Sequence, residues 1–236
     1  MRIAPATLND WVAGLFAVGS SLFVVGSVPA YIGAVGERAD AATYALGSVF
    51  FTAAAFGQLV QAQDPALAAG AGVGGPVAVP RWSWRPRDRG WLAAVTQLPG
   101  TVFFNISTFA ALAHNLTVAG EDRRVWRPDV YGSVLFLVAS TLGVLALGRI
   151  GQVRPRSAAW WAAWLNLVGS VAFMASAIGA YVVPDSGAAA NLGLAVGGTL
   201  VGAACFLAGA VLLVPAWRQD VAAATPSTEK SIEGAP

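Results

Sequence analysis

The chain is 236 residues long, with 56% hydrophobic residues, 11% charged residues and a formal net charge of +2. A soluble domain usually carries about 25% charged residues, so this composition excludes an ordinary soluble globule, whose surface needs more charge. The single cysteine, Cys205, excludes an intramolecular disulfide and a cysteine-based metal cluster. The apolar residues gather in long blocks, which indicates a membrane protein.

Six blocks without a charged residue follow one another along the chain. A bilayer core about 30 Å thick takes roughly 20 helical residues, and each block is that long or nearly so. The blocks are Trp11–Gly36, Ala41–Gln63, Gly90–Gly120, Val130–Gly148, Ser157–Pro184 and Ser186–Trp217. We therefore predict an all-α polytopic membrane protein with six transmembrane helices, arranged as three related helical hairpins.

The stretches between the blocks divide the chain further. Residues 64–80 are rich in Gly, Ala and Pro, and the last residues are small and polar, as is typical of linkers and disordered tails. We expect a first hairpin over 1–63, a Gly/Pro-rich then Arg/Trp-rich cytoplasmic linker over 64–90, a second hairpin over 91–148, a third over 149–221, and a disordered cytoplasmic tail over 222–236.

Basic residues are shared unequally between the two predicted sides of the membrane. The side that holds both termini has ten of them, Arg2, Arg81, Arg85, Arg87, Arg89, Arg149, Arg154, Arg156, Arg218 and Lys230. Positive residues collect on the cytoplasmic side, so both termini should be cytoplasmic. All nine tryptophans lie near a predicted membrane boundary, the depth that amphipathic indoles favour.

Arginine alternates with tryptophan over Arg81–Trp91, just before the third block. One interpretation is a site for anionic lipid headgroups, because each juxtamembrane basic residue contributes about 1 kcal/mol near a charged leaflet. Ordinary anchoring at the interface explains the same residues and is favoured. The stretch is short and beside the membrane, so we expect the lipid bilayer as the partner and no nucleic acid.

A short motif of Gly, then Ser or Thr, with Phe four residues after the Gly, recurs along the chain. It reads GSSLF, GTVFF and GSVAF in the odd blocks and GSVFF, GSVLF and a degraded GTLVG (198–202) in the even ones. The residues of this motif are Gly19, Ser20, Phe23, Gly47, Ser48, Gly100, Phe104, Gly132, Ser133, Gly169, Ser170 and Phe173. Small residues let helix backbones approach in lipid, so the motif predicts helix packing; small residues lining a substrate path are the alternative.

The order of these motifs resembles a known family. A Trp followed by F-x-x-GS-x-x-F, and then by a second helix with GS-x-x-F, is similar to the YrhK-like domain, a two-helix bacterial membrane module whose function is unknown. Trp11, Phe16 and residues 19–23 carry the resemblance best, together with 47–51. The whole chain resembles actinobacterial multi-pass membrane proteins. The resemblance implies a bacterial plasma membrane and brings no catalytic residues.

Polar residues inside the blocks are few. Asn105 lies in mid-block near Thr101 and Thr108, and Asn166 lies in the fifth block. One hypothesis is that these four line a central polar site. The alternative, which we favour, is an interhelical hydrogen bond of about 0.6 kcal/mol. Gln58 and Gln97 are further polar residues that we expect to be buried.

The sequence does not indicate a reaction. His114 is the only histidine, and no nucleophile–base pair or metal-ligand cluster is visible. We therefore expect no enzymatic activity and no cofactor. The favoured function is a scaffold or interaction protein that packs through small-residue helix faces, with a second copy or a membrane protein as its partner. The alternative is a transporter or facilitator of a small neutral or lipidic solute.

Overall fold

The computed structural model describes residues 2–64, 67, 76–79, 82–113, 116–148 and 152–224. The described part is helical, which confirms the all-α prediction, apart from a bridge between Val182 and Ala189 and one short strand pair. In that pair β1 (Arg2–Ile3) runs antiparallel to β2 (Val77–Ala78), with Arg2 opposite Ala78. The start of the chain is thereby tied to the predicted linker.

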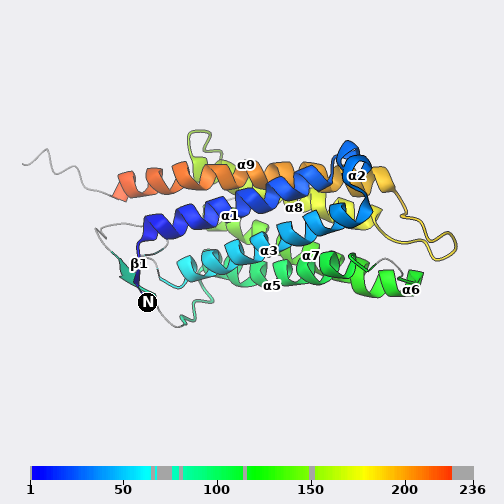
Figure 1. Cartoon of the computed structure of the whole chain (residues 1–236). Coiled ribbons are helices and arrows are strands. Elements are labelled where there is room, and N and C mark those ends of the chain that lie inside the picture. Colours follow the sequence, from blue (N-terminus) through cyan, green and yellow to red (C-terminus); the bar gives the residue numbers. More distant parts are fainter. Residues whose placement is uncertain are drawn as a thin grey trace, which may run out of the picture.

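The described residues form six long helices, with shorter elements between them. The long ones are α1 (Pro5–Gly26), α3 (Glu37–Ala62), α5 (Arg89–Ala110), α7 (Arg127–Ala146), α8 (Ala158–Gly179) and α9 (Leu192–Ala224). The short α2 (Pro29–Val35) follows α1, while α6 (Val118–Glu121) and the π-helical η1 (Asp122–Trp126) lead into α7. Figure 1 shows the long helices side by side, with α1 beginning and α9 ending at the same end.

Several helix limits differ from the predicted blocks. The first block was expected to span to Gly36, but α1 ends at Gly26, because Pro29 holds Val28 in extended backbone and starts α2. The third block ends as a helix at Ala110. In the predicted tail, residues 222–224 belong to α9, and 225–236 lie outside the described residues.

Five helical segments among the described residues are long and apolar enough to cross a membrane. They are Pro5–Gly26, Glu37–Ala62, Val118–Ala146, Ala158–Gly179 and Leu192–Ala223. The chain therefore fits an integral membrane protein. The sixth expected span corresponds to α5, which is 22 residues long but is not among these segments. Its polar residues, which include Arg89, Gln97 and Asn105, lower its hydropathy.

The long helices form a closed ring in chain order. Each packs against the next along the chain, and α9 packs against α1 to close the ring. The most extensive packing joins α1 with α3, α5 with α7, and α8 with α9. Consecutive long helices run in opposite directions (Figure 1), which is an up-and-down arrangement.

A glycine from each helix allows close approach within each of these three pairs. The facing glycines are Gly19 with Gly47, Gly100 with Gly132, and Gly169 with Gly202. A Cβ atom on Gly19 would lie 3.0 Å from the carbonyl oxygen of Gly47 and 2.9 Å from the ring of Phe51. Since this is at or below the shortest distance that such contacts show, only glycine fits without movement of the neighbouring helix.

Six phenylalanines, one from each long helix, fill the centre of the ring. They are Phe23, Phe51, Phe104, Phe136, Phe173 and Phe206, all buried. Their rings meet in pairs, with centroids 5.0 Å apart for Phe104 and Phe136 and 6.4 Å apart for Phe51 and Phe136. We call them the phenylalanine layer. The space left between them is about 10 Å³, no more than one water needs, so the centre of the ring is closed.

The structure corrects the position of the motif in α9. The sequence pointed to GTLVG at 198–202, without a phenylalanine. In the structure the glycine that faces Gly169 is Gly202, and Phe206 lies four residues after it in the phenylalanine layer. The corresponding stretch is therefore Gly-Ala-Ala-Cys-Phe, in which Ala203 replaces the Ser or Thr. The residue after the glycine is fully buried in every long helix, as Ser20, Ser48, Thr101, Ser133, Ser170 and Ala203 show.

Candidate functional site

A cavity of about 500 Å³ lies inside the ring, at the end of the bundle where α1 begins and α9 ends. All six long helices line it, from Asn9 on α1 to Trp217 and Asp220 on α9. Phe51, Phe136 and Phe206 also line it, so the phenylalanine layer forms its inner boundary. Its volume is within the range of small-molecule sites, about 300–1,000 Å³.

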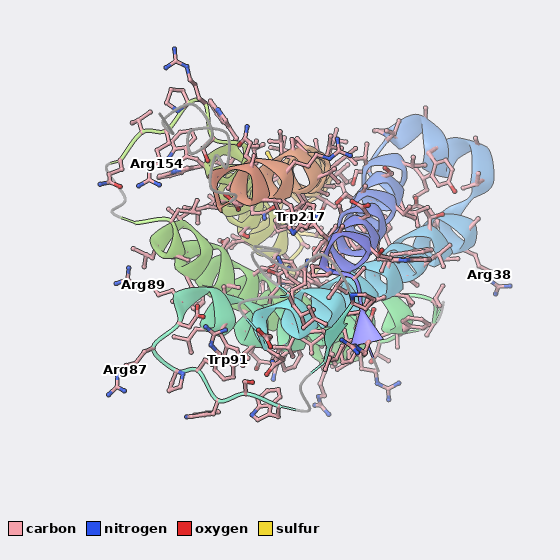
Figure 2. The ribbon with its side chains drawn as sticks, turned by 90° about the vertical axis from the view of Figure 1, so that its left-hand side faces the viewer. Arg38, Arg87, Arg89, Trp91, Arg154 and Trp217 are labelled. Carbon is pink, nitrogen blue, oxygen red and sulfur yellow. The ribbon has the colours of Figure 1, made fainter. Side chains whose placement is uncertain are left out.

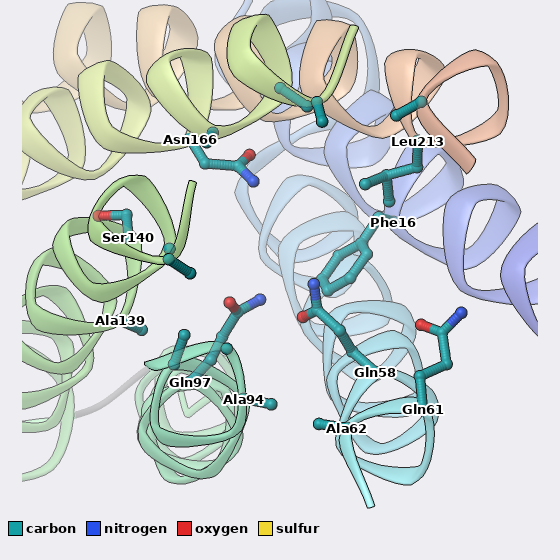
Figure 3. Close-up of a pocket in the computed structure, with 18 of the residues that line it drawn as sticks. Phe16, Gln58, Gln61, Ala62, Ala94, Gln97, Ala139, Ser140, Asn166 and Leu213 are labelled. Carbon is teal, nitrogen blue, oxygen red and sulfur yellow. The ribbon is translucent and has the colours of Figure 1, made fainter. Parts of the chain in front are cut away.

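Five neutral amides contribute to the polar lining of this cavity. They come from α1, α3, α5 and α8 and are Asn9, Gln58, Gln61, Gln97 and Asn166. Figure 3 shows Gln58, Gln97 and Asn166 pointing into the space between the helices. Amides both donate and accept hydrogen bonds, so this lining can bind polar groups that carry no charge.

Small residues keep the cavity open. Apart from the aromatic rings and Leu213, its apolar lining is mostly alanine, namely Ala62, Ala93, Ala94, Ala139, Ala146, Ala159, Ala162, Ala163, Ala210 and Ala216. Gly143 on α7 also lines it, and a Cβ atom on Gly143 would meet nothing within 4 Å. The glycine here leaves open space, unlike the glycines beside the phenylalanine layer.

Three buried polar atoms of the cavity lining lack a hydrogen-bond partner among the described residues. They are Oε1 of Gln58 and the Nε1 atoms of Trp91 and Trp217. A buried donor or acceptor left without a partner costs about 1–3 kcal/mol. A molecule bound in the cavity supplies the missing partners when small movements of these side chains bring the atoms to its surface.

Trp91 is held firmly at the start of α5. Asp88 caps this helix, since its Oδ1 accepts from the backbone N–H groups of Gly90 and Trp91 at 2.9 and 3.2 Å. The rings of Trp82 and Trp84 pack edge-on against Trp91 at centroid distances of 5.8 and 5.3 Å. Trp91 is only 2% exposed, so its indole packs almost entirely against protein.

Charged residues occur only at the mouth of the cavity, as far as the structure describes its lining. Arg85 pairs with Asp88 at 2.9 Å and also donates to the carbonyl oxygen of Ala62 at 3.2 Å. The third charged residue is Asp220. The described lining therefore contains one cation, Arg85, and two carboxylates, and Arg85 is already paired with one of them.

The predicted lipid-binding stretch Arg81–Trp91 is divided between different roles. Arg81 lies outside the described residues, as do His114 and Asn115. Arg85 belongs to the mouth of the cavity, whereas Arg87 extends away from the helices (Figure 2) and Arg89 reaches the end of α7. Nη1 of Arg89 donates to the carbonyl oxygen of Leu145 at 2.9 Å.

The four residues predicted to share a polar site are not brought together. Asn166 lines the cavity. Asn105 lies next to the phenylalanine layer and donates from Nδ2 to Oγ1 of Thr52 on α3 at 2.8 Å. Thr108 bonds to Ser48 at 2.9 Å, and Thr101 donates to the carbonyl oxygen of Leu98 at 2.7 Å. None of these three is among the described lining residues of the cavity.

Trp91 and Trp217 were not predicted as site residues, because every tryptophan was expected at the membrane boundary. In the structure Trp11 and Trp161 are 64% and 45% exposed, unlike Trp91. The spacing within the repeat was the one indication in the sequence. Trp91 precedes its motif glycine by nine residues, whereas Trp11 and Trp161 precede theirs by eight. One residue turns a helical side chain by about 100°, which is enough to move it from the outer to the inner face.

Comparison of the chain with protein-family models, curated proteins and solved structures finds no match. The similarity to the YrhK-like domain therefore stays a prediction. Among the described residues no group of three or more histidine, cysteine and acidic side chains could hold a metal ion.

Proposed function

We propose that this integral membrane protein binds a small uncharged molecule in the cavity between its helices. The observation that carries the proposal is the lining: neutral amides and two indoles surround about 500 Å³, and three of the buried polar atoms there have no partner among the described residues. Such a lining favours the transporter or facilitator that was the alternative prediction over a scaffold whose helices only pack against one another.

In this proposal the protein spans the membrane six times as three related hairpins of the YrhK-like type, and it has no enzymatic activity. The recurring glycine and phenylalanine contacts of the three helix pairs support the hairpin repeat. The cavity then opens to the cytoplasm of a bacterial cell, since it lies at the end where both termini are expected. A reporter fused after residue 220 should be cytoplasmic, and an extracytoplasmic reporter would contradict this orientation.

The test is to fill the cavity without disturbing the fold. Gly143→Leu places a side chain in the open space, whereas Gly14→Leu adds the same side chain on the exposed side of α1, where a Cβ atom also meets nothing within 4 Å. Both variants and the unaltered protein are purified in mild detergent, and their bound small molecules are identified by mass spectrometry. We expect the bound molecule to be lost only from Gly143→Leu. Identical contents in all three would overturn the proposal.

A non-enzymatic scaffold is the second candidate, because the phenylalanine layer closes the centre of the ring. Its partner would be a second copy or another membrane protein. Flux of an uncharged solute separates a facilitator from a scaffold. Proteoliposomes are tested for glycerol permeability by light scattering. A rate above that of empty liposomes, which Gly143→Leu removes, supports a facilitator, whereas the rate of empty liposomes contradicts one and leaves the bound molecules found by mass spectrometry to separate binding from a scaffold.

A further inference from the structure

The chemistry of the unpartnered atoms defines the ligand more closely, and this inference rests on the proposed function. Trp91 and Trp217 each offer an indole N–H group, which donates a hydrogen bond and accepts none. Both Nε1 atoms are buried and without a partner among the described residues. A ligand that draws these two N–H groups to the cavity surface must therefore present acceptor atoms to them.

The acceptor must belong to an uncharged group. Arg85, the one cation among the described lining residues, is already bound to Asp88 and to the carbonyl oxygen of Ala62. A carboxylate or phosphate in the cavity would have no free cation to pair with, and it would approach past Asp220 at the mouth. Burial of an unpaired anion is strongly unfavourable.

The rest of the ligand must be apolar and of moderate size. Alanine side chains and phenylalanine rings form the remaining wall of the cavity, which holds about 500 Å³. Oε1 of Gln58 adds an unpartnered acceptor, which can receive a hydroxyl or amide hydrogen of the ligand. We infer that the cavity binds an uncharged amphipathic molecule whose carbonyl or hydroxyl oxygen accepts hydrogen bonds from the indoles of Trp91 and Trp217.

Two matched probes test this inference. Prodan (6-propionyl-2-dimethylaminonaphthalene) is uncharged and carries a ketone acceptor, and 2-dimethylaminonaphthalene is the same ring system without the ketone. Binding is measured by fluorescence titration of the protein in nanodiscs, with empty nanodiscs as background. The variants are Trp91→Phe and Trp217→Phe, which keep a ring and remove the donor, with Trp11→Phe on the exposed side of α1 as the control.

We expect each of Trp91→Phe and Trp217→Phe to weaken prodan binding about tenfold, the effect of one lost hydrogen bond, and to leave the ketone-free probe and the Trp11→Phe control unchanged. Equal weakening of both probes would mean that the indoles only shape the cavity, and no weakening of either would mean that they do not bind the ligand; each result overturns the inference. The proposed function fails separately, if Gly143→Leu binds both probes as tightly as the unaltered protein.

Discussion

Phe173 occupies the position that a side chain on Gly202 would need. A Cβ atom on Gly202 would lie 2.5 Å from Cδ2 of Phe173 and 3.0 Å from the carbonyl oxygen of Gly169. This is the closest of the glycine and phenylalanine contacts in the three helix pairs, and it joins α8 to α9. The contact explains why a glycine and a phenylalanine recur together, since the phenylalanine ring fills the space beside the glycine that a side chain would otherwise occupy.

Gly202→Ala should therefore destabilise the protein, by about 2 kcal/mol, because overpacking of this kind costs about 1–3 kcal/mol. Gly197→Ala on the same helix is the control: a Cβ atom there meets nothing within 4 Å, and alanine favours the helix. Thermal denaturation in detergent compares the two. Equal midpoints would contradict the packing role of Gly202.

Phe51 makes ring contacts with Phe16, Phe23, Phe136 and Phe206. Phe51→Ala removes all of them and should cost about 3 kcal/mol. It should also let the cavity extend past the phenylalanine layer, which a facilitator would report as faster glycerol flux. Phe56 on the same helix is 60% exposed, so Phe56→Ala should neither destabilise the protein to this extent nor change the flux. A variant Phe51→Ala as stable as Phe56→Ala would show that the layer is not a main source of stability.

Asn105 serves the contact between α3 and α5 rather than the cavity. Asn105→Leu and Thr52→Val each remove one side of the 2.8 Å hydrogen bond. Their coupling in a double-mutant cycle should be about 0.6 kcal/mol, as is usual within membranes. Prodan binding should stay unchanged in both. Loss of binding on Asn105→Leu, with folding intact, would restore the central polar site that the sequence suggested.

Asp88 should act mainly as a helix cap. Asp88→Ala removes the acceptor for the N–H groups of Gly90 and Trp91 and should cost about 1 kcal/mol. Asp88→Asn keeps the cap but loses the ion pair with Arg85. Both side chains of this pair are about one-third exposed, and exposed pairs contribute little to stability. We expect the unfolding midpoint to be highest for the unaltered protein, lower for Asp88→Asn and lowest for Asp88→Ala. If Asp88→Asn lowers the midpoint as much as Asp88→Ala does, the ion pair with Arg85 is the important contact.

The sequence was sufficient for the helical class and for most of the packing motif, because both follow from local spacing. The motif glycine of α9 was misplaced because two glycines each match part of the motif. Gly198 is followed by Thr199 but has no Phe four residues later, whereas Gly202 has Phe206 at that position but is followed by Ala203. The close approach of Gly202 to Gly169 identifies it as the equivalent glycine.

The cavity could not be predicted, since it depends on residues far apart in the chain. Asn9 and Leu213, for example, are 204 positions apart and meet at its edge. Asn166 was selected for its polarity and does line the cavity, but the same argument selected Asn105, Thr101 and Thr108, which do not. Polarity within an apolar block marks a residue that needs a partner, and it does not say whether that partner is a neighbouring helix or a ligand.

Because α9 packs against α1, every long helix has a packed neighbour on both sides, and the ring has no gap that marks where its first helix must be. The first and last long helices are packed neighbours, and α1 begins and α9 ends at the same end of the bundle (Figure 1). A gene rearranged to start at the second hairpin and to join the old ends by a short linker would connect the same neighbours in the same order. The protein should therefore tolerate circular permutation in the segment between α3 and α5.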